Sequence, residues 1–246
     1  MSDSQDNLYA MRHSLAHILA TAVQDLWPEV KLGVGPVVDN GFYYDIDLGP
    51  DVKLSEDDFP RIEEKMHEII KSAQPFERFT MPVLEALHWA RQYDQPYKEE
   101  LLNDLQREGT TLAKDLNAAL MGLPAGITGS TAPQAVTEVS FYRNGDFTDL
   151  CRGPHVESTD TVGAFKLMRV AGAYWRSKES NPQMQRVYGV GFETEKELRT
   201  YLAMLEEAKK RDHRKLGTEL DLFTFSDLVG AGLPLFTPRG TVLRKN

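Results

Sequence analysis

The chain has 246 residues, of which 41% are hydrophobic and 26% charged, a composition typical of a soluble globular protein with a sizeable core. Its formal net charge of −9 argues against nonspecific coating of nucleic acid, although basic stretches at 166–178 and 196–215 leave local RNA contact open. A single cysteine allows no internal disulfide, and the sequence contains neither a signal core nor an apolar run of membrane-spanning length, so we expect a cytoplasmic protein that does not contact membranes.

The first element is an amphipathic helix that carries a pair of histidines. Residues 1–7 are polar and are expected to be disordered, whereas apolar residues from Leu8 onward recur at helical spacing as far as Leu26. His13 and His17 lie four positions apart, so a helix places both imidazoles on one face. Histidines on such a helix are more often packed or surface residues than ligands, and the pair alone therefore proves little.

Helix and strand signals then alternate along the chain. Gly, Pro and Asx-Gly turns separate the strands, and the helices are bounded by acidic caps or by proline. Helices are expected at 55–73, 83–93 and 99–108, and strands at 31–38, 42–47, 76–81, 136–143, 147–149, 164–171, 172–176 and 184–192. This mixture predicts an α+β fold in which helices pack on antiparallel sheets and form a pocket.

Two later regions differ in character from the rest. Residues 110–137 form the least regular part, with a loop rich in Gly, Pro and small residues. From Thr194 a strongly helical pattern predicts one helix that ends near Leu216, with Gly217 as its stop, and its basic end suits either the helix dipole or a phosphate backbone.

The segment Asp-Leu-Cys-Arg-Gly-Pro-His at 149–155 is the strongest candidate for a functional site. It holds Cys151, the only cysteine, and His155 four positions later, and the Gly and Pro between them favour a shaped loop or strand end. A lone cysteine is usually a small buried hydrophobe. Together with His13 and His17, however, these residues would form either a tetrahedral zinc set or the polar floor of a hydrolytic pocket.

Longer motifs extend this pattern to a known family. They are Arg-His-Ser-Leu-Ala-His at 12–17, Gly-Pro-Val-Val-Asp-Asn-Gly-Phe-Tyr-Tyr-Asp at 35–45, the cysteine segment at 149–155, and Phe-Lys-Leu-Met with Ala-Gly-Ala-Tyr-Trp-Arg within 165–176. In this order they resemble the editing domain of bacterial threonyl-tRNA synthetases. The basic stretch at 210–217 resembles the linker that joins this domain to the class II catalytic domain.

The resemblance implies a domain organisation. It places an editing domain at 1–193, a linker helix at 194–216 and the truncated start of the class II catalytic domain at 217–246. The ubiquitin-like module that often precedes the editing domain and the ATP-binding motifs of the catalytic domain have no counterpart, so this piece is not expected to activate threonine. It is expected to be monomeric, whereas the parent enzyme would dimerise through its catalytic domain.

The resemblance also implies an activity, hydrolysis of the ester of tRNA(Thr) mischarged with serine. Such a reaction is needed because serine lacks one methyl of threonine, and this difference gives only about 10–200-fold discrimination at a synthetic site. A second pocket that rejects the methyl group can remove the error.

The resemblance assigns a role to each candidate residue. His13 and Lys98 would activate or position water and stabilise the leaving 3′-oxygen, while His17, Cys151 and His155 line the pocket. Asp149 would accept the serine ammonium, and Tyr44 would shape the wall that excludes the methyl. The sequence alone gives no reason to choose Lys98, since a lysine at that place is normally solvated, and the longer connection at 110–137 weakens its alignment.

Two questions remain open from the sequence. Related alanyl-tRNA editing domains bind zinc through the same pattern of histidines and cysteine, which here comprises His13, His17, Cys151 and His155. The threonyl family works without metal. The resemblance therefore requires no cofactor, and zinc is an alternative. One competing function is a catalytically silent module that binds tRNA or is stabilised by zinc. The other is a free-standing alanyl-type deacylase, but the motifs at 165–176 and the linker argue against it.

Overall fold

A computed structural model describes residues 3–108, 136–211, 213–226, 230 and 233–245. The irregular region at 110–137 therefore lies outside the described residues, apart from its last two positions. The chain forms two compact units, Met1–Leu198 and Arg199–Asn246. Among the described residues, no helix is both long and apolar enough to cross a membrane.

The first unit contains two antiparallel sheets. The larger sheet has the strand order β1-β3-β8-β7, with β2 also paired to β3, and the smaller has the order β4-β5-β6. The strands are β1 (Lys31–Leu32), β2 (Val37–Val38), β3 (Gly41–Asp47), β4 (Glu77–Pro82), β5 (Glu138–Asn144), β6 (Phe147–Leu150), β7 (Ala164–Tyr174) and β8 (Gln183–Phe192). The predicted α+β class with antiparallel sheets is confirmed, and the two strand segments expected within 164–176 form the single strand β7.

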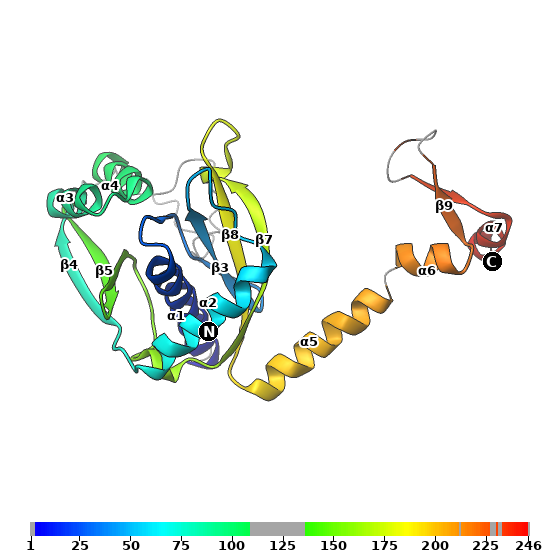
Figure 1. Cartoon of the computed structure of the whole chain (residues 1–246), viewed down its shortest axis with the longest axis horizontal. Coiled ribbons are helices and arrows are strands. Elements are labelled where there is room, and N and C mark those ends of the chain that lie inside the picture. Colours follow the sequence, from blue (N-terminus) through cyan, green and yellow to red (C-terminus); the bar gives the residue numbers. More distant parts are fainter. Residues whose placement is uncertain (1–2, 109–135, 212, 227–229, 231–232, 246) are drawn as a thin grey trace. The chain divides into compact units, whose positions relative to one another are not determined.

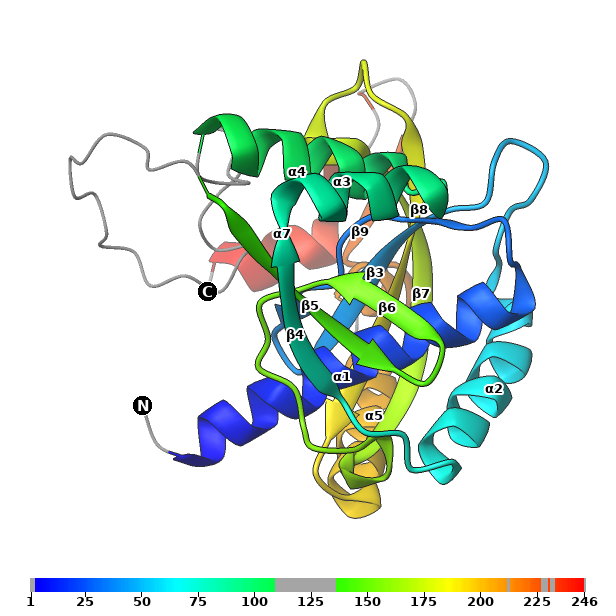
Figure 2. The same ribbon diagram turned by 90° about the vertical axis from the view of Figure 1, so that its left-hand side faces the viewer.

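Helix α1 (Asp3–Leu26) lies between the two sheets, as Figures 1 and 2 show from two directions. Leu15, Ile18 and Leu19 are fully buried in a core shared with Phe42 and Ile46 of β3. The expected disorder of residues 1–7 is wrong from Asp3 onward, because extending a packed helix adds one hydrogen bond per residue and needs no new nucleus.

The other helices of this unit cover the sheets. Helix α2 (Phe59–Lys71) follows the short 3-10 turn η1 (Glu56–Asp58) and packs its apolar face into the α1 core. Helices α3 (Val83–Gln92) and α4 (Pro96–Glu108) share a second core with Val139 and Phe141 of β5. Short 3-10 turns η3 (Thr159–Thr161) and η4 (Trp175–Ser177) lie on either side of β7.

Strand alternation decides which side chains of the small sheet reach α1. Val139 and Phe141 face α3 and α4, so the intervening positions of β5 point to the other face. There the amide Nδ2 of Asn144 donates to Thr21 Oγ1 of α1 over 3.3 Å. Tyr142 is directly opposite Asp149 in the register of β5 and β6, and both side chains consequently lie on the α1 side.

The second unit differs from the single helix predicted at 194–216. Helix α5 (Glu195–Lys210) begins in the first unit, and a separate helix α6 (His213–Glu219) precedes β9 (Phe223–Phe225), β10 (Pro234–Phe236) and α7 (Pro238–Lys245). Gly217 is not the stop but lies inside α6. A Cβ at this position would lie 2.1 Å from the Phe223 ring, so glycine is needed there for packing.

Candidate active site

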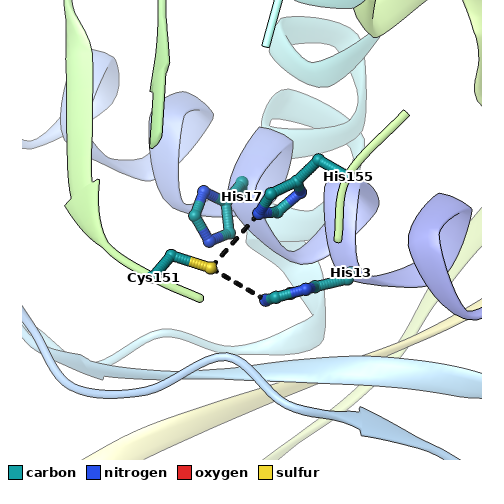
Figure 3. A group of neighbouring side chains, drawn as sticks. All are labelled: His13, His17, Cys151 and His155. Carbon is teal, nitrogen blue, oxygen red and sulfur yellow. Dashed lines mark hydrogen bonds between the residues drawn. The ribbon is translucent and has the colours of Figure 1, made fainter. Parts of the chain in front are cut away.

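Four potential metal ligands from distant parts of the chain converge in the first unit (Figure 3). His13 and His17 lie one turn apart on α1, while Cys151 and His155 belong to the segment that follows β6. The ligand atoms of the four residues all lie within 4.8 Å of one another. The structure thus brings together the two pairs that the sequence analysis singled out.

The hydrogen bonds of His13 and His155, which are partly buried, fix the tautomers of their rings. The ring Nδ1 of His13 lies 3.1 Å from the carbonyl oxygen of Pro154, which can only accept, so this nitrogen carries the hydrogen. Ser14 donates its single hydroxyl hydrogen to Ala10 O over 2.8 Å and therefore accepts from Nδ1 of His155 over 3.0 Å. In the neutral rings both Nε2 atoms then carry a free lone pair.

Both lone pairs point at the same sulfur. Cys151 Sγ lies 3.4 Å from Nε2 of His13 and 3.3 Å from Nε2 of His155 (Figure 3). Burial raises the pKa of the Cys151 thiol to about 12, and burial lowers the pKa of His13 to about 4, so both groups are neutral at pH 7. Because a thiol has one hydrogen, it can satisfy only one of the two imidazoles. The other remains available to a water proton or a metal ion.

His17 is the most enclosed of the three imidazoles, with 2% of its surface exposed. Burial holds its pKa well below the usual value, and His13 and Lys98 nearby add to this effect. Its Nδ1 has no hydrogen-bond partner among the described residues, and its Nε2 lies 3.8 Å from Asp149 Oδ2. A buried nitrogen without a partner is costly, which is consistent with a water or an ion bound in this pocket.

The donor set fits zinc chemically. Three neutral imidazoles and one cysteine are ligand types that zinc accepts in fourfold sites. The bonds from the Nδ1 atoms of His13 and His155 to Pro154 and Ser14 are outer contacts of the kind that orient metal-binding rings. The same arrangement equally suits a metal-free pocket in which a free imidazole nitrogen accepts a proton.

A second polar cluster, Tyr44, Lys98 and Asp149, adjoins these residues. Lys98 Nζ lies 2.5 Å from Asp149 Oδ1, and the Tyr44 hydroxyl donates to Asp149 Oδ2 over 2.5 Å. Lys98 Nζ also donates to the Tyr44 hydroxyl over 3.3 Å. All three are buried, with exposed fractions of 0% for Tyr44, 2% for Lys98 and 3% for Asp149. Both carboxylate oxygens of Asp149 are therefore engaged, and a substrate ammonium would have to share or displace Lys98.

Tertiary contacts of α4 explain why Lys98 is buried. The neighbouring Tyr97 donates its hydroxyl to Asp47 Oδ2 over 2.5 Å and packs on Trp175, with 4.9 Å between the ring centroids. Trp175 Nε1 in turn donates to Glu100 of α4 over 2.8 Å. These contacts hold the start of α4 against the large sheet, so Lys98 extends into the protein rather than into solvent.

Three residues of the site have no distinguishing signal in the sequence. Ser14, which orients His155, differs from any other helical serine only by its place between the two histidines. Phe76 stacks on His155 at 4.9 Å and 6°, and Tyr142 meets the same ring edge-on at 4.4 Å. Their roles arise from packing between segments far apart in the chain.

Gly153 shapes the turn between Cys151 and His155. Its φ of +78° is unfavourable for other residues, and a Cβ would lie 2.3 Å from the Tyr142 hydroxyl. We expect Gly153→Ala to lower the free energy of unfolding by more than the ~1–3 kcal/mol of a strained backbone alone. Chemical denaturation provides the measurement.

Gly49→Ala is the matched control for this substitution. Gly49 has a nearly identical φ of +77°, but nothing lies within 4 Å of a Cβ there. The difference between the two variants isolates the clash with Tyr142. Equal losses of stability would show that this contact does not constrain the turn.

Residues 139–188 match the family described as the threonyl and alanyl tRNA synthetase second additional domain. The chain is 48% identical over 99% of its length to a threonine–tRNA ligase of Rubrobacter xylanophilus, and 47% identical over 99% to one of Thermobifida fusca. A third such ligase, from a Sulfurihydrogenibium species, is 44% identical over 99%. The chain is a relative of the threonine–tRNA ligases. It spans about a third of their length, 33% of the first, 35% of the second and 34% of the third.

The predicted resemblance to threonyl-tRNA synthetases is thereby confirmed. The match to the second additional domain includes β5, β6 and the segment that carries Cys151 and His155. It ends within β8, before α5 begins, and so concerns the first unit alone.

Proposed function

We propose that the first unit is an editing hydrolase that cleaves the ester between serine and the 3′-terminal adenosine of tRNA(Thr). One observation carries this proposal: two imidazole lone pairs converge on one neutral thiol, directly beside the buried Lys98–Asp149–Tyr44 cluster. A site that only held a structural zinc ion would need no buried lysine and carboxylate next to it.

The residues suggest a balanced reaction. His13 Nε2, which lacks a hydrogen, accepts a proton from water as the oxygen attacks the ester carbonyl. The bond between the carbonyl carbon and the 3′-oxygen then breaks, and the leaving oxygen takes the proton back from His13. Lys98 stabilises the negative charge that develops on oxygen in this water-poor site. The products are serine and tRNA with a free 3′-hydroxyl.

Discrimination against threonine would come from the shape of the pocket. The ring of Tyr44 is fixed by its bond to Asp149 and by Gly35, where a Cβ would lie 2.3 Å from the ring. A rigid wall can reject an additional methyl, whereas a flexible one can adapt to it. We assign Asp149 to the substrate ammonium, for which Lys98 must move away from Asp149 Oδ1.

Zinc is the alternative cofactor for this reaction. His13, His17, Cys151 and His155 would hold it, and the ion would lower the pKa of a bound water toward about 7. The proposal requires no cofactor, since a free imidazole nitrogen can already serve as the base.

The proposal extends to the parent protein. By analogy with its relatives, this chain would belong to a threonine–tRNA ligase that uses ATP and works in the cytoplasm, with residues 194–216 as the linker and residues 217–246 as the start of the class II domain. Dimerisation would depend on that catalytic domain, and the chain alone would be monomeric.

Deacylation of Ser-tRNA(Thr) and Thr-tRNA(Thr), with and without a zinc chelator, tests the function. We expect selective loss of serine, and a decrease in rate of about 10²–10⁴-fold for His13→Ala. His88→Ala, a substitution on the exposed face of α3, is the control. Activity that disappears with the chelator would assign the reaction to zinc. Intact Ser-tRNA(Thr), with tRNA still bound, would instead favour a silent binding module.

A further inference from the structure

The site-facing side of the small sheet continues outward from the pocket. Asp149 of β6 is paired in register with Tyr142 of β5, which is paired with Arg78 of the edge strand β4. Directly opposite residues lie on the same face of an antiparallel sheet. The row thus runs from the buried Asp149, past Tyr142 at 9% exposure, to the exposed Arg78.

A second arginine lies on the segment that carries the thiol. Arg152 follows Cys151 directly and is exposed, while the ring of Tyr142 lies edge-on to His155 at 4.4 Å. Arg78 is the register partner of Tyr142, and its positive charge opposes the rise that burial causes in the pKa of Tyr142. Arg152 thus lies on the turn at 151–155, and Arg78 lies opposite Tyr142, whose ring contacts His155 of the same turn.

Both arginines are electrostatically available. Within the residues that the structure describes, no ion pair joins Arg78 or Arg152 to an acid. Arg143 of β5 offers a contrast, because it pairs with Glu77 at 2.6 Å on the opposite face of the sheet.

A groove that includes His155 carries acidic side chains, those of Glu157 and Glu193. Phosphate would be repelled from this groove and attracted to the side of Arg78 and Arg152. Charge thereby disfavours a polyanion in this groove and favours one that passes the two arginines.

We propose that Arg78 and Arg152 form a phosphate-binding site for the single-stranded 3′ end of an RNA, which crosses β5 and β4 as it enters the pocket. The inference rests on the proposed function for the identity of the RNA, because an aminoacyl ester at the 3′ end must reach the histidines while its preceding phosphates remain outside. Arginine suits this role through bidentate contacts with phosphate oxygens.

Salt-dependent binding of uncharged tRNA(Thr) tests the inference independently of hydrolysis. Each phosphate contact contributes about 0.7 to the slope of log affinity against log salt for a single strand. Arg78→Ala and Arg152→Ala should each reduce the slope by about 0.7 and the affinity by about tenfold, and the double variant should show about twice the change in slope. Arg61→Ala, which removes an exposed arginine from α2, is the charge-matched control.

The outcomes separate this inference from the proposed function. Reduced slopes without any deacylation by the unsubstituted chain would support the phosphate site and overturn the hydrolase. The phosphate site would be overturned if the unsubstituted chain deacylates its substrate while Arg78→Ala, Arg152→Ala and the double variant leave the salt slope and the tRNA affinity unchanged. A decrease as large in Arg61→Ala would also overturn it, because the effect would then come from net charge alone. Absence of measurable tRNA binding by the unsubstituted chain would count against it as well.

Discussion

Lys98→Met is expected to lower the free energy of unfolding by about 3–5 kcal/mol, because it leaves the carboxylate of Asp149 buried without its cation. The methionine fills a similar volume, so the loss reports charge rather than a cavity. Deacylation of Ser-tRNA(Thr) should fall at least about a hundredfold, since the developing oxyanion loses its positive partner. Denaturation by urea and single-turnover deacylation are the measurements.

A double-mutant cycle makes this prediction specific. Asp149→Asn should also destabilise, whereas Lys98→Met combined with Asp149→Asn should lose less than the sum of the two, by about 0.5–3 kcal/mol. Lys166→Met is the surface control, because the pair of Lys166 with Glu63 leaves 47% of the lysine side chain exposed. Strict additivity of the two buried substitutions would contradict a direct pair.

Acid is expected to destabilise the metal-free first unit strongly through its three site histidines. Burial lowers the pKa of His13 to about 4, and it lowers the pKa values of His17 and His155 further. In the unfolded chain all three regain a value near 6.5, so the unfolded state binds more protons below that pH. The stability from these groups is therefore complete above about pH 6.5 and decreases as the pH falls toward 4.

The expected size of this effect is large. Each histidine contributes up to about 1.4 kcal/mol per pH unit in that range, so the three together remove about 5 kcal/mol between pH 7 and pH 5. Chelator-treated protein should be unfolded with urea at several pH values. His155→Gln should reduce the slope by about one proton, whereas His88→Gln, at an exposed position of α3, should leave it unchanged. A slope that does not differ between these two variants would contradict the burial of neutral imidazoles.

Two pairs of site residues could be predicted from the sequence, because the members of each pair are only four positions apart. Helical spacing fixes His13 and His17 on one face, and the Gly and Pro of 149–155 predict a turn that brings Cys151 near His155. The errors at the helix boundaries arose from packing, which the local sequence does not show. Residues 3–7 continue a helix whose nucleus is stabilised by packing, and Gly217 lies inside α6 because Phe223 occupies the space of its Cβ.

Family resemblance supplied what local geometry could not. Lys98 has no signal in the sequence, since a lysine at a helix start is normally solvated, and Tyr44 could equally have been a core residue. The resemblance named both, and the structure places them in contact with Asp149. Phe76 and Tyr142 belong to no motif, and Ser14 lies within the motif at 12–17 without a role assigned to it. The contacts of these three residues around His155 emerged only from the structure.

By itself the sequence determined the helix that carries His13 and His17, the turn that carries Cys151 and His155, and the α+β class. These properties follow from backbone periodicity and from the preferences of glycine and proline, which act over a few residues. Only the tertiary structure decided that α1 lies between the two sheets, that Lys98 is buried against Asp149, and that both Nε2 lone pairs meet one thiol. The Lys98–Asp149 and His13–Cys151 contacts join residues more than fifty positions apart, and they depend on burial and desolvation, which no local pattern encodes.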